Sequence, residues 1–82
     1  MSASLYYRVT KVKDTSIGYL DYIIAKKLFD GQKYGSVIIN KDIIPFLEGV
    51  AAASSDKYLI RDCDKLIGEL KREGELELYF AS

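Results

Sequence analysis

The alternation of apolar and polar positions is clearest between residues 55 and 72, where it follows the period of an α-helix. One face of this predicted helix collects apolar side chains: Leu59, Cys63, Leu66 and Leu70, with Ile60 and Ile67 on its flank. The opposite face collects basic residues around a glycine: Lys57, Arg61, Lys65 and Arg72 around Gly68. Acidic residues are expected along the borders between the two faces: Asp62, Asp64 and Glu69. We expect the apolar face to close a core and the basic face to remain available to a partner.

Two segments near the ends of the chain alternate with the two-residue period of a β-strand. Residues 5–13 are rich in aromatic and β-branched side chains, and they predict a strand with a bulge or an early end near Lys11. Residues 75–80 predict a second strand with one apolar face and one acidic face. The acidic face complements the basic residues of the first strand: Arg8, Lys11 and Lys13. Because opposite charges stabilise neighbouring strands, we expect the two terminal strands to pair.

A further helix is predicted over residues 17–29, ending at the Asp30-Gly31 turn. It follows three residues that favour N-cap positions: Asp14, Thr15 and Ser16. Its expected inner face is aliphatic: Ile17, Leu20, Ile24 and Leu28. Its outer face is also largely apolar: Tyr19, Tyr22 and Phe29, beside Ile23 and Lys26. Two interpretations stay open, because either a partner covers this outer face or the helix is simply buried under the N-terminal strand.

The middle of the chain adds a short strand and one more helix. Residues 36–39 form an apolar run that is typical of a strand in the centre of a sheet. The next helix is predicted over residues 43–53, with Asp42 as its N-cap and Pro45 in its first turn. The pair Ser54-Ser55 would end this helix and cap the following one.

These elements predict a single small binding domain over residues 1–82. Its fold class is α+β, with three helices packed on a small, mainly antiparallel sheet. The sheet would contain the N-terminal strand, the short central strand and the C-terminal strand.

The composition excludes several classes of function. The 82 residues include 12 basic and 12 acidic ones, so the formal charge is zero, whereas a protein built mainly to neutralise phosphates carries a basic excess. The chain has no histidine and one cysteine, which removes the commonest general base and any thiolate metal site. Cys63 falls on the apolar face of its helix, where a thiol behaves as a small hydrophobe. We therefore predict that the protein is not an enzyme and uses no cofactor and no metal.

The hydropathy pattern indicates where in the cell the protein is expected to act. No apolar run approaches the ~20 residues of a transmembrane helix, and the N-terminal segment lacks the hydrophobic core of a secretion signal. We expect a cytoplasmic protein with no membrane partner, and a viral or plasmid protein of this kind would act in the cytoplasm of its host.

The order of elements from residue 17 to residue 80 resembles that of a winged-helix domain. The stretch LKREGELEL, residues 70–78, resembles the exit of a third helix into a wing. This resemblance implies a DNA-binding regulator whose recognition helix spans residues 55–72. The residues it implies for nucleic-acid binding are Lys57, Arg61, Lys65 and Arg72, with Gly68 allowing close backbone approach. The acidic strand that follows departs from a wing that contacts phosphate, so nucleic acid is the less favoured partner.

The tyrosine content favours a protein-binding module instead, because tyrosine supplies a large contact area at low entropic cost. Such a module would be an inhibitor or adaptor that occludes a surface of another protein, and an anti-defence factor of a virus or plasmid is one form of it. The expected anchors are Tyr19, Tyr22 and Phe29, followed by Tyr6, Tyr34 and Tyr79. Homodimerisation through the helix of residues 17–29 is a variant of this interpretation.

Overall fold

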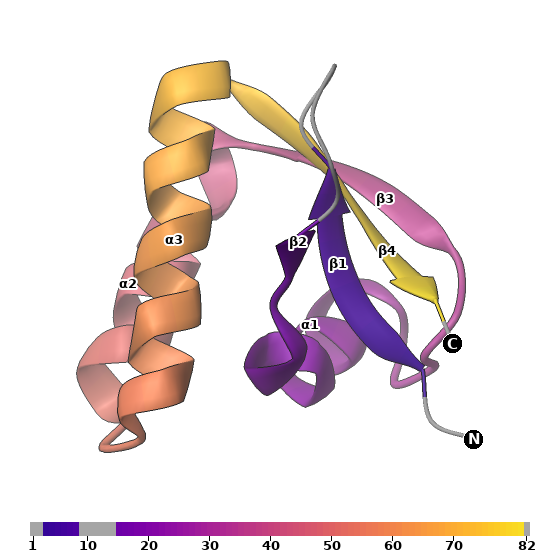
Figure 1. Cartoon of the computed structure of the whole chain (residues 1–82), viewed down its shortest axis with the longest axis horizontal. Coiled ribbons are helices and arrows are strands. Elements are labelled where there is room, and N and C mark those ends of the chain that lie inside the picture. The colour runs from indigo at the N-terminus through magenta and orange to yellow at the C-terminus, as the bar shows by residue number, and fades with distance from the viewer. Residues whose placement is uncertain (1–2, 9–14, 82) are drawn as a thin grey trace.

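The protein is described by a computed structural model that covers residues 3–8 and 15–81, and its centre is one four-stranded antiparallel sheet (Figure 1). The strands lie in the order β2-β1-β4-β3. Their bounds are Ser4–Arg8 for β1, Thr15–Ser16 for β2, Ser36–Asn40 for β3 and Glu75–Ala81 for β4.

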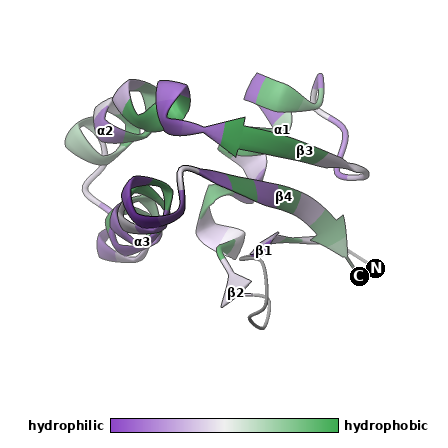
Figure 2. Cartoon of the chain, turned by 90° about the horizontal axis from the view of Figure 1, so that it is seen from above, coloured by the Kyte–Doolittle hydropathy of each residue, from purple (hydrophilic) through white to green (hydrophobic). Residues whose placement is uncertain are grey.

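Three α-helices pack on this sheet, which confirms the predicted α+β class. They are α1 (Asp21–Leu28), α2 (Ile44–Ala53) and α3 (Lys57–Glu73). Two short 3-10 helices precede α1 and α2, namely η1 (Gly18–Leu20) and η2 (Lys41–Ile43). Helices α2 and α3 lie side by side in both views (Figures 1 and 2). Within the described residues, no helix combines the length and the apolar content that crossing a bilayer requires.

The terminal strands pair as predicted. Strand β1 lies antiparallel to β4, with Ser4 opposite Ala81 and Arg8 opposite Glu77. The Nη1 atom of Arg8 lies 3.4 Å from the Oε1 atom of Glu77. The two ends of the described chain therefore meet in the middle of the sheet. Two of the expected basic partners, Lys11 and Lys13, and the expected bulge near Lys11 fall outside the described residues.

The position of β3 corrects the sequence prediction, because β3 is an edge strand and not a central one. Its side chains alternate between the two faces of the sheet. Ile39 is buried and Val37 is half-buried against the core, but Ile38 is 59% exposed. A short apolar run does not distinguish a strand buried on both faces from an edge strand that exposes one apolar residue.

The segment before α1 also differs from the prediction. Thr15 and Ser16 pair with β1 instead of capping a helix, and Asp14 lies outside the described residues. The N–H of Ile17 donates to the carbonyl oxygen of Leu5 at 2.9 Å, which holds the chain extended there. The helix therefore starts with η1 and becomes α-helical only at Asp21. Its end is as predicted, because Gly31 has a φ of 86° and donates to the carbonyl of Ala25.

The N-caps of the other two helices lie close to the predicted residues but not on them. The Asn40 side chain accepts the N–H of Asp42 at 2.8 Å, so Asn40 and not Asp42 begins the η2–α2 segment. Pro45 lies in the first turn of α2, as predicted. The Asp56 carboxylate accepts the N–H of Tyr58 at 2.9 Å, so Asp56 replaces the predicted serine pair as the cap of α3.

The core lies between the sheet and the helices, and α3 closes it as its pattern predicts. The fully buried side chains come from every layer: Leu5, Ile17, Leu20, Ile24, Leu47, Cys63, Leu66, Leu70 and Leu78. Leu59 is only half-buried at the start of α3, and Leu28 is half-buried at the end of α1. The winged-helix order is not confirmed, because the third long strand of the sheet is β1 from the N-terminal end of the chain.

Candidate protein-binding surface

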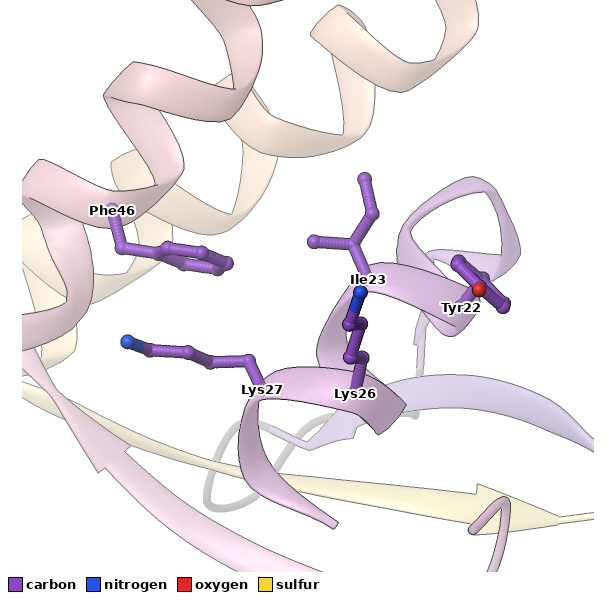
Figure 3. Close-up of a pocket in the computed structure, with 5 residues that line it drawn as sticks. All are labelled: Tyr22, Ile23, Lys26, Lys27 and Phe46. Atoms are coloured by element: carbon purple, nitrogen blue, oxygen red, sulfur yellow. The ribbon is translucent and has the colours of Figure 1, made fainter. Parts of the chain in front are cut away.

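A groove lies between α1 and α2 on the helical side of the described chain. It has a volume of about 490 Å³ and is lined by Tyr22, Ile23, Lys26, Lys27 and Phe46. Figure 3 shows Phe46 and Tyr22 at opposite ends, with Ile23 projecting between them. The Nζ atom of Lys27 lies 5.0 Å from the centre of the Phe46 ring. The groove therefore offers apolar contact area beside two ammonium groups.

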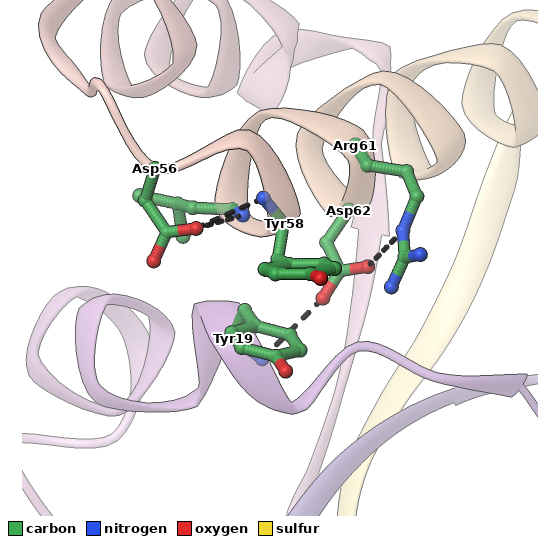
Figure 4. A network of polar contacts seen from close by, with 6 residues as sticks. Tyr19, Asp56, Tyr58, Arg61 and Asp62 are labelled. Atoms are coloured by element: carbon green, nitrogen blue, oxygen red, sulfur yellow. Dashed lines mark hydrogen bonds and ion pairs between the residues drawn. The ribbon is translucent and has the colours of Figure 1, made fainter.

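Exposed tyrosines continue from this groove onto α3. Tyr22 is 70% exposed, Tyr19 is 54% exposed and Tyr58 is 42% exposed. The rings of Tyr19 and Tyr58 stack with their centres 5.2 Å apart and their planes at 19° (Figure 4). We call these three residues the tyrosine surface. It joins two elements that are distant in sequence, the η1–α1 segment and the first turn of α3.

Basic side chains frame the stacked pair. The guanidinium carbon of Arg61 lies 5.2 Å from the Tyr58 ring centre, and the Nζ atom of Lys57 lies 5.4 Å from it. These distances allow cation–π attraction, which favours one orientation of the ring. Tyr58 was missed in the sequence analysis, although the signal was present: it is an aromatic residue beside Lys57 and three positions before Arg61.

A buried carboxylate from α3 holds the backbone of the tyrosine surface at Tyr19. Asp62 is 2% exposed, and its Oδ2 atom accepts the backbone N–H of Tyr19 at 3.3 Å (Figure 4). Its Oδ1 atom lies 3.9 Å from the Nε atom of Arg61. Burial raises the pKa of Asp62 above its ordinary value, while the Tyr19 hydrogen bond and Arg61 oppose that rise. Asp62 was expected along a border between the two faces of this helix, and the structure shows that border position buried, because η1 packs over this part of α3.

The other predicted anchors do not belong to this surface. Phe29 is half-buried, and its ring meets that of Phe80 edge-on at 5.1 Å, so it joins the core instead of facing outward. The reason is that α1 ends at Leu28 and the following residue turns toward the sheet. Tyr34 is 68% exposed in the turn before β3, and it does not line the groove.

Tyr6 and Tyr79 form a separate pair on the face of the sheet that points away from the core. Their rings stack with centres 5.6 Å apart, and the guanidinium carbon of Arg8 lies 4.6 Å from the Tyr79 ring centre. Both tyrosines are half-buried. The structure thus separates the predicted anchors, because Tyr19 and Tyr22 lie on the tyrosine surface whereas Tyr6 and Tyr79 lie on the open face of the sheet.

The basic face of α3 is exposed as predicted, at Lys57, Arg61, Lys65, Gly68 and Arg72. Its charge is partly neutralised within the helix. Arg72 forms ion pairs with Glu69 and with Glu73, and Arg61 lies beside the Asp62 carboxylate. Ion pairs of this kind reduce the charge that is available to phosphates.

The lone cysteine lies in an environment that keeps its thiol protonated. Cys63 is fully buried, and burial together with Asp64 and Asp62 raises the pKa of its thiol to about 11. A thiol with that pKa is neutral at pH 7 and is a poor nucleophile. Nowhere in the described ranges do three or more acidic, cysteine or histidine side chains converge as a metal site would require.

Comparisons with protein-family models, with curated proteins and with solved structures give no match.

Proposed function

We propose that the protein is a non-catalytic protein-recognition module that occludes a surface of its partner, as an inhibitor or an adaptor does. The observation that supports this proposal is the tyrosine surface, in which three exposed rings come from two packed elements. Asp62 and the stacking on Tyr58 hold Tyr19 in place before any partner arrives. Less freedom is then lost on binding, which raises affinity.

The chemistry of the surface also defines the partner. Tyrosines supply rigid contact area with a polar tip, and such residues often dominate the binding energy of protein interfaces. The groove adds an apolar floor, and Lys26 and Lys27 line it. The matching partner presents an apolar side chain for the groove and carboxylates that face the two lysines.

Affinity capture from the native host, with the tagged protein as bait, tests this function. We expect a specific protein to be retained and Tyr22→Ala to abolish its retention, because Tyr22 joins the tyrosine surface to the groove. Tyr34→Ala is the matched control, since Tyr34 is similarly exposed but does not line the groove. Retention by Tyr22→Ala, or loss in both variants, contradicts the assignment of binding to this surface.

DNA recognition through α3 is the second candidate, and the exposed basic face of that helix favours it. Duplex binding that weakens steeply with salt and is lost in Arg61→Glu would support this alternative. Self-association through α1 is a variant of the first proposal. A dimer that Tyr19→Asp separates into folded monomers would support that variant.

A further inference from the structure

The two edges of the sheet differ in length and in protection. As described, β2 contributes two residues to one edge, whereas β3 contributes five to the other. Natural edge strands are commonly protected by charged residues, proline or bulges, but β3 has the sequence SVIIN and carries no charge and no proline. Figure 2 shows it as a hydrophobic strand along the border of the sheet. Ile38, at its centre, is 59% exposed.

The backbone of β3 presents hydrogen-bonding groups to this border. The N–H of Phe80 donates to the carbonyl oxygen of Gly35 at 3.1 Å. Pairing in an antiparallel ladder alternates, so Val37 and Ile39 exchange hydrogen bonds with β4, whereas the N–H and C=O groups of Ser36 and Ile38 point away from it. No other described strand lies on that side of β3.

We propose that a second copy of this chain pairs with β3, antiparallel and with the two-fold axis at Ile38. In this register the N–H of Ile38 donates to the carbonyl of the partner's Ile38, and the reverse bond forms by symmetry. Ser36 lies opposite the partner's Asn40. Val37 lies opposite the partner's Ile39 on the core face. The two sheets become one sheet of eight strands.

The sequence around β3 favours a second copy over an unrelated strand, because it is complementary to itself in this register. The five paired positions are uncharged, so no like charges oppose one another. The flanking charges also avoid each other, since Lys41 falls opposite the partner's Gly35 and Asp42 opposite the partner's Tyr34. On the open face, Ile38 packs against its own equivalent, which removes two exposed apolar side chains from water.

Self-pairing also explains how such an edge avoids open-ended assembly. A two-fold contact uses the same patch on both molecules and therefore closes on itself. It consumes the long edge of each sheet and leaves the described two-residue β2 at both outer ends. Pairing of five residues from each chain buries less surface area than the ~1,200 Å² at the lower limit of stable interfaces. We therefore expect a dimer that dissociates on dilution.

Sedimentation velocity over a range of concentrations tests the dimer. The wild type should move from the 9.3 kDa monomer to a species of twice that mass as its concentration rises. Ile38→Lys should remain monomeric, because the two lysines would meet at the axis. It should stay folded, since Ile38 lies opposite Glu77 of its own β4, which pairs with the lysine. The control Ile38→Val, which keeps an apolar edge, should still dimerise.

Disulfide cross-linking tests the register. In the proposed dimer the two Ile38 Cα atoms are about 5.5 Å apart, so Ile38→Cys should give a covalent dimer on oxidation. The two Ser36 positions are at least ~13 Å apart along the strands, so Ser36→Cys should not. The native thiol does not interfere, because Cys63 is fully buried. Circular dichroism verifies that each variant is folded.

A wild type that stays monomeric at all concentrations overturns the proposal. So does a dimer that Ile38→Lys fails to separate, or cross-linking by Ser36→Cys without cross-linking by Ile38→Cys. The inference does not depend on the proposed function, because Ile38 does not belong to the tyrosine surface or the groove. Folded, monomeric Ile38→Lys should still capture the partner protein.

Discussion

Asp62 shows at the residue scale how one buried charge can serve a binding surface at a cost in stability. Below its ordinary pKa of 3.8 the carboxyl is neutral in the folded and the unfolded chain. As the pH rises, the Asp62 carboxyl ionises in water in the unfolded chain, but in the folded chain its charge is buried. A raised pKa therefore means that Asp62 lowers the free energy of unfolding above that range.

We predict that Asp62→Asn removes the contribution of Asp62 to the pH dependence of the free energy of unfolding, and that it raises this free energy at pH 7. The amide keeps an oxygen that accepts the Tyr19 N–H, and it carries no charge. Asp62→Leu is the matched control, since it is also uncharged and similar in size but leaves that N–H unpaired. It should be about 1–3 kcal/mol less stable than Asp62→Asn. Urea denaturation between pH 3 and pH 7 measures both effects, and equal stabilities of the two variants would contradict the proposed role of the hydrogen bond.

At the scale of single elements, the first turn of α3 links stability to the proposed function. Asp56 accepts the N–H groups of Tyr58 and Leu59, so its cap fixes the turn that carries Tyr58. We predict that Asp56→Ala lowers the free energy of unfolding by about 1 kcal/mol and weakens partner capture. Ser55→Ala should change neither, because Ser55 is exposed and is not the cap. Thermal denaturation followed by circular dichroism compares the two variants. A larger loss of stability in Ser55→Ala than in Asp56→Ala would support the serine cap that the sequence predicted.

Elements with one buried face were the ones that the sequence could predict. In α3, the apolar period placed Cys63, Leu66 and Leu70 in the core because this side of the helix packs on other apolar side chains. The terminal strands were predictable for the same reason, and their opposite charges indicated that they pair. Local periodicity and charge were sufficient in these cases.

Features that depend on tertiary neighbours were not predictable in this way. Asp62 is a charged residue beside Arg61, so nothing local indicates that η1 covers it. Tyr58 belongs to the candidate site because Tyr19 stacks on it, a contact between elements that are distant in sequence. The edge position of β3 depends on which strands pair with β4, and an apolar run carries no information about that order. The sequence therefore predicted Tyr19 and Tyr22 of the candidate site, whereas the roles of Tyr58 and Asp62 follow only from the tertiary structure.

The whole molecule depends on a contact between its two ends. Strand β1 lies between β2 and β4, and it contributes Leu5 and Tyr7 to the core. The carbonyl of Leu5 also accepts the N–H of Ile17, so β1 positions the segment that leads to the tyrosine surface. Because β1 and β4 are so far apart in sequence, their pairing orders the whole chain at once, and we expect a single cooperative unfolding transition.

Leu5→Ala tests this dependence. Leu5 is fully buried, so the variant should lose about 2–5 kcal/mol of unfolding free energy, a large fraction of the ~5–15 kcal/mol typical of a native protein. Arg8→Ala on the same strand is the control. Its side chain is 51% exposed and pairs with Glu77 on the open face, so its loss should cost about 1 kcal/mol or less.

Chemical denaturation followed by circular dichroism and by tyrosine fluorescence should give coincident transitions for all three proteins, with only Leu5→Ala strongly shifted. Coincidence matters because the two probes report different regions: circular dichroism reports mainly the helices, and fluorescence reports tyrosines on both faces. If Leu5→Ala costs no more than Arg8→Ala, β1 is a dispensable addition to a core made by α1, α2, α3 and β4. The tyrosine surface would then persist without β1, whereas the hydrogen bond between Ile17 and Leu5 makes the segment that leads to it depend on this strand.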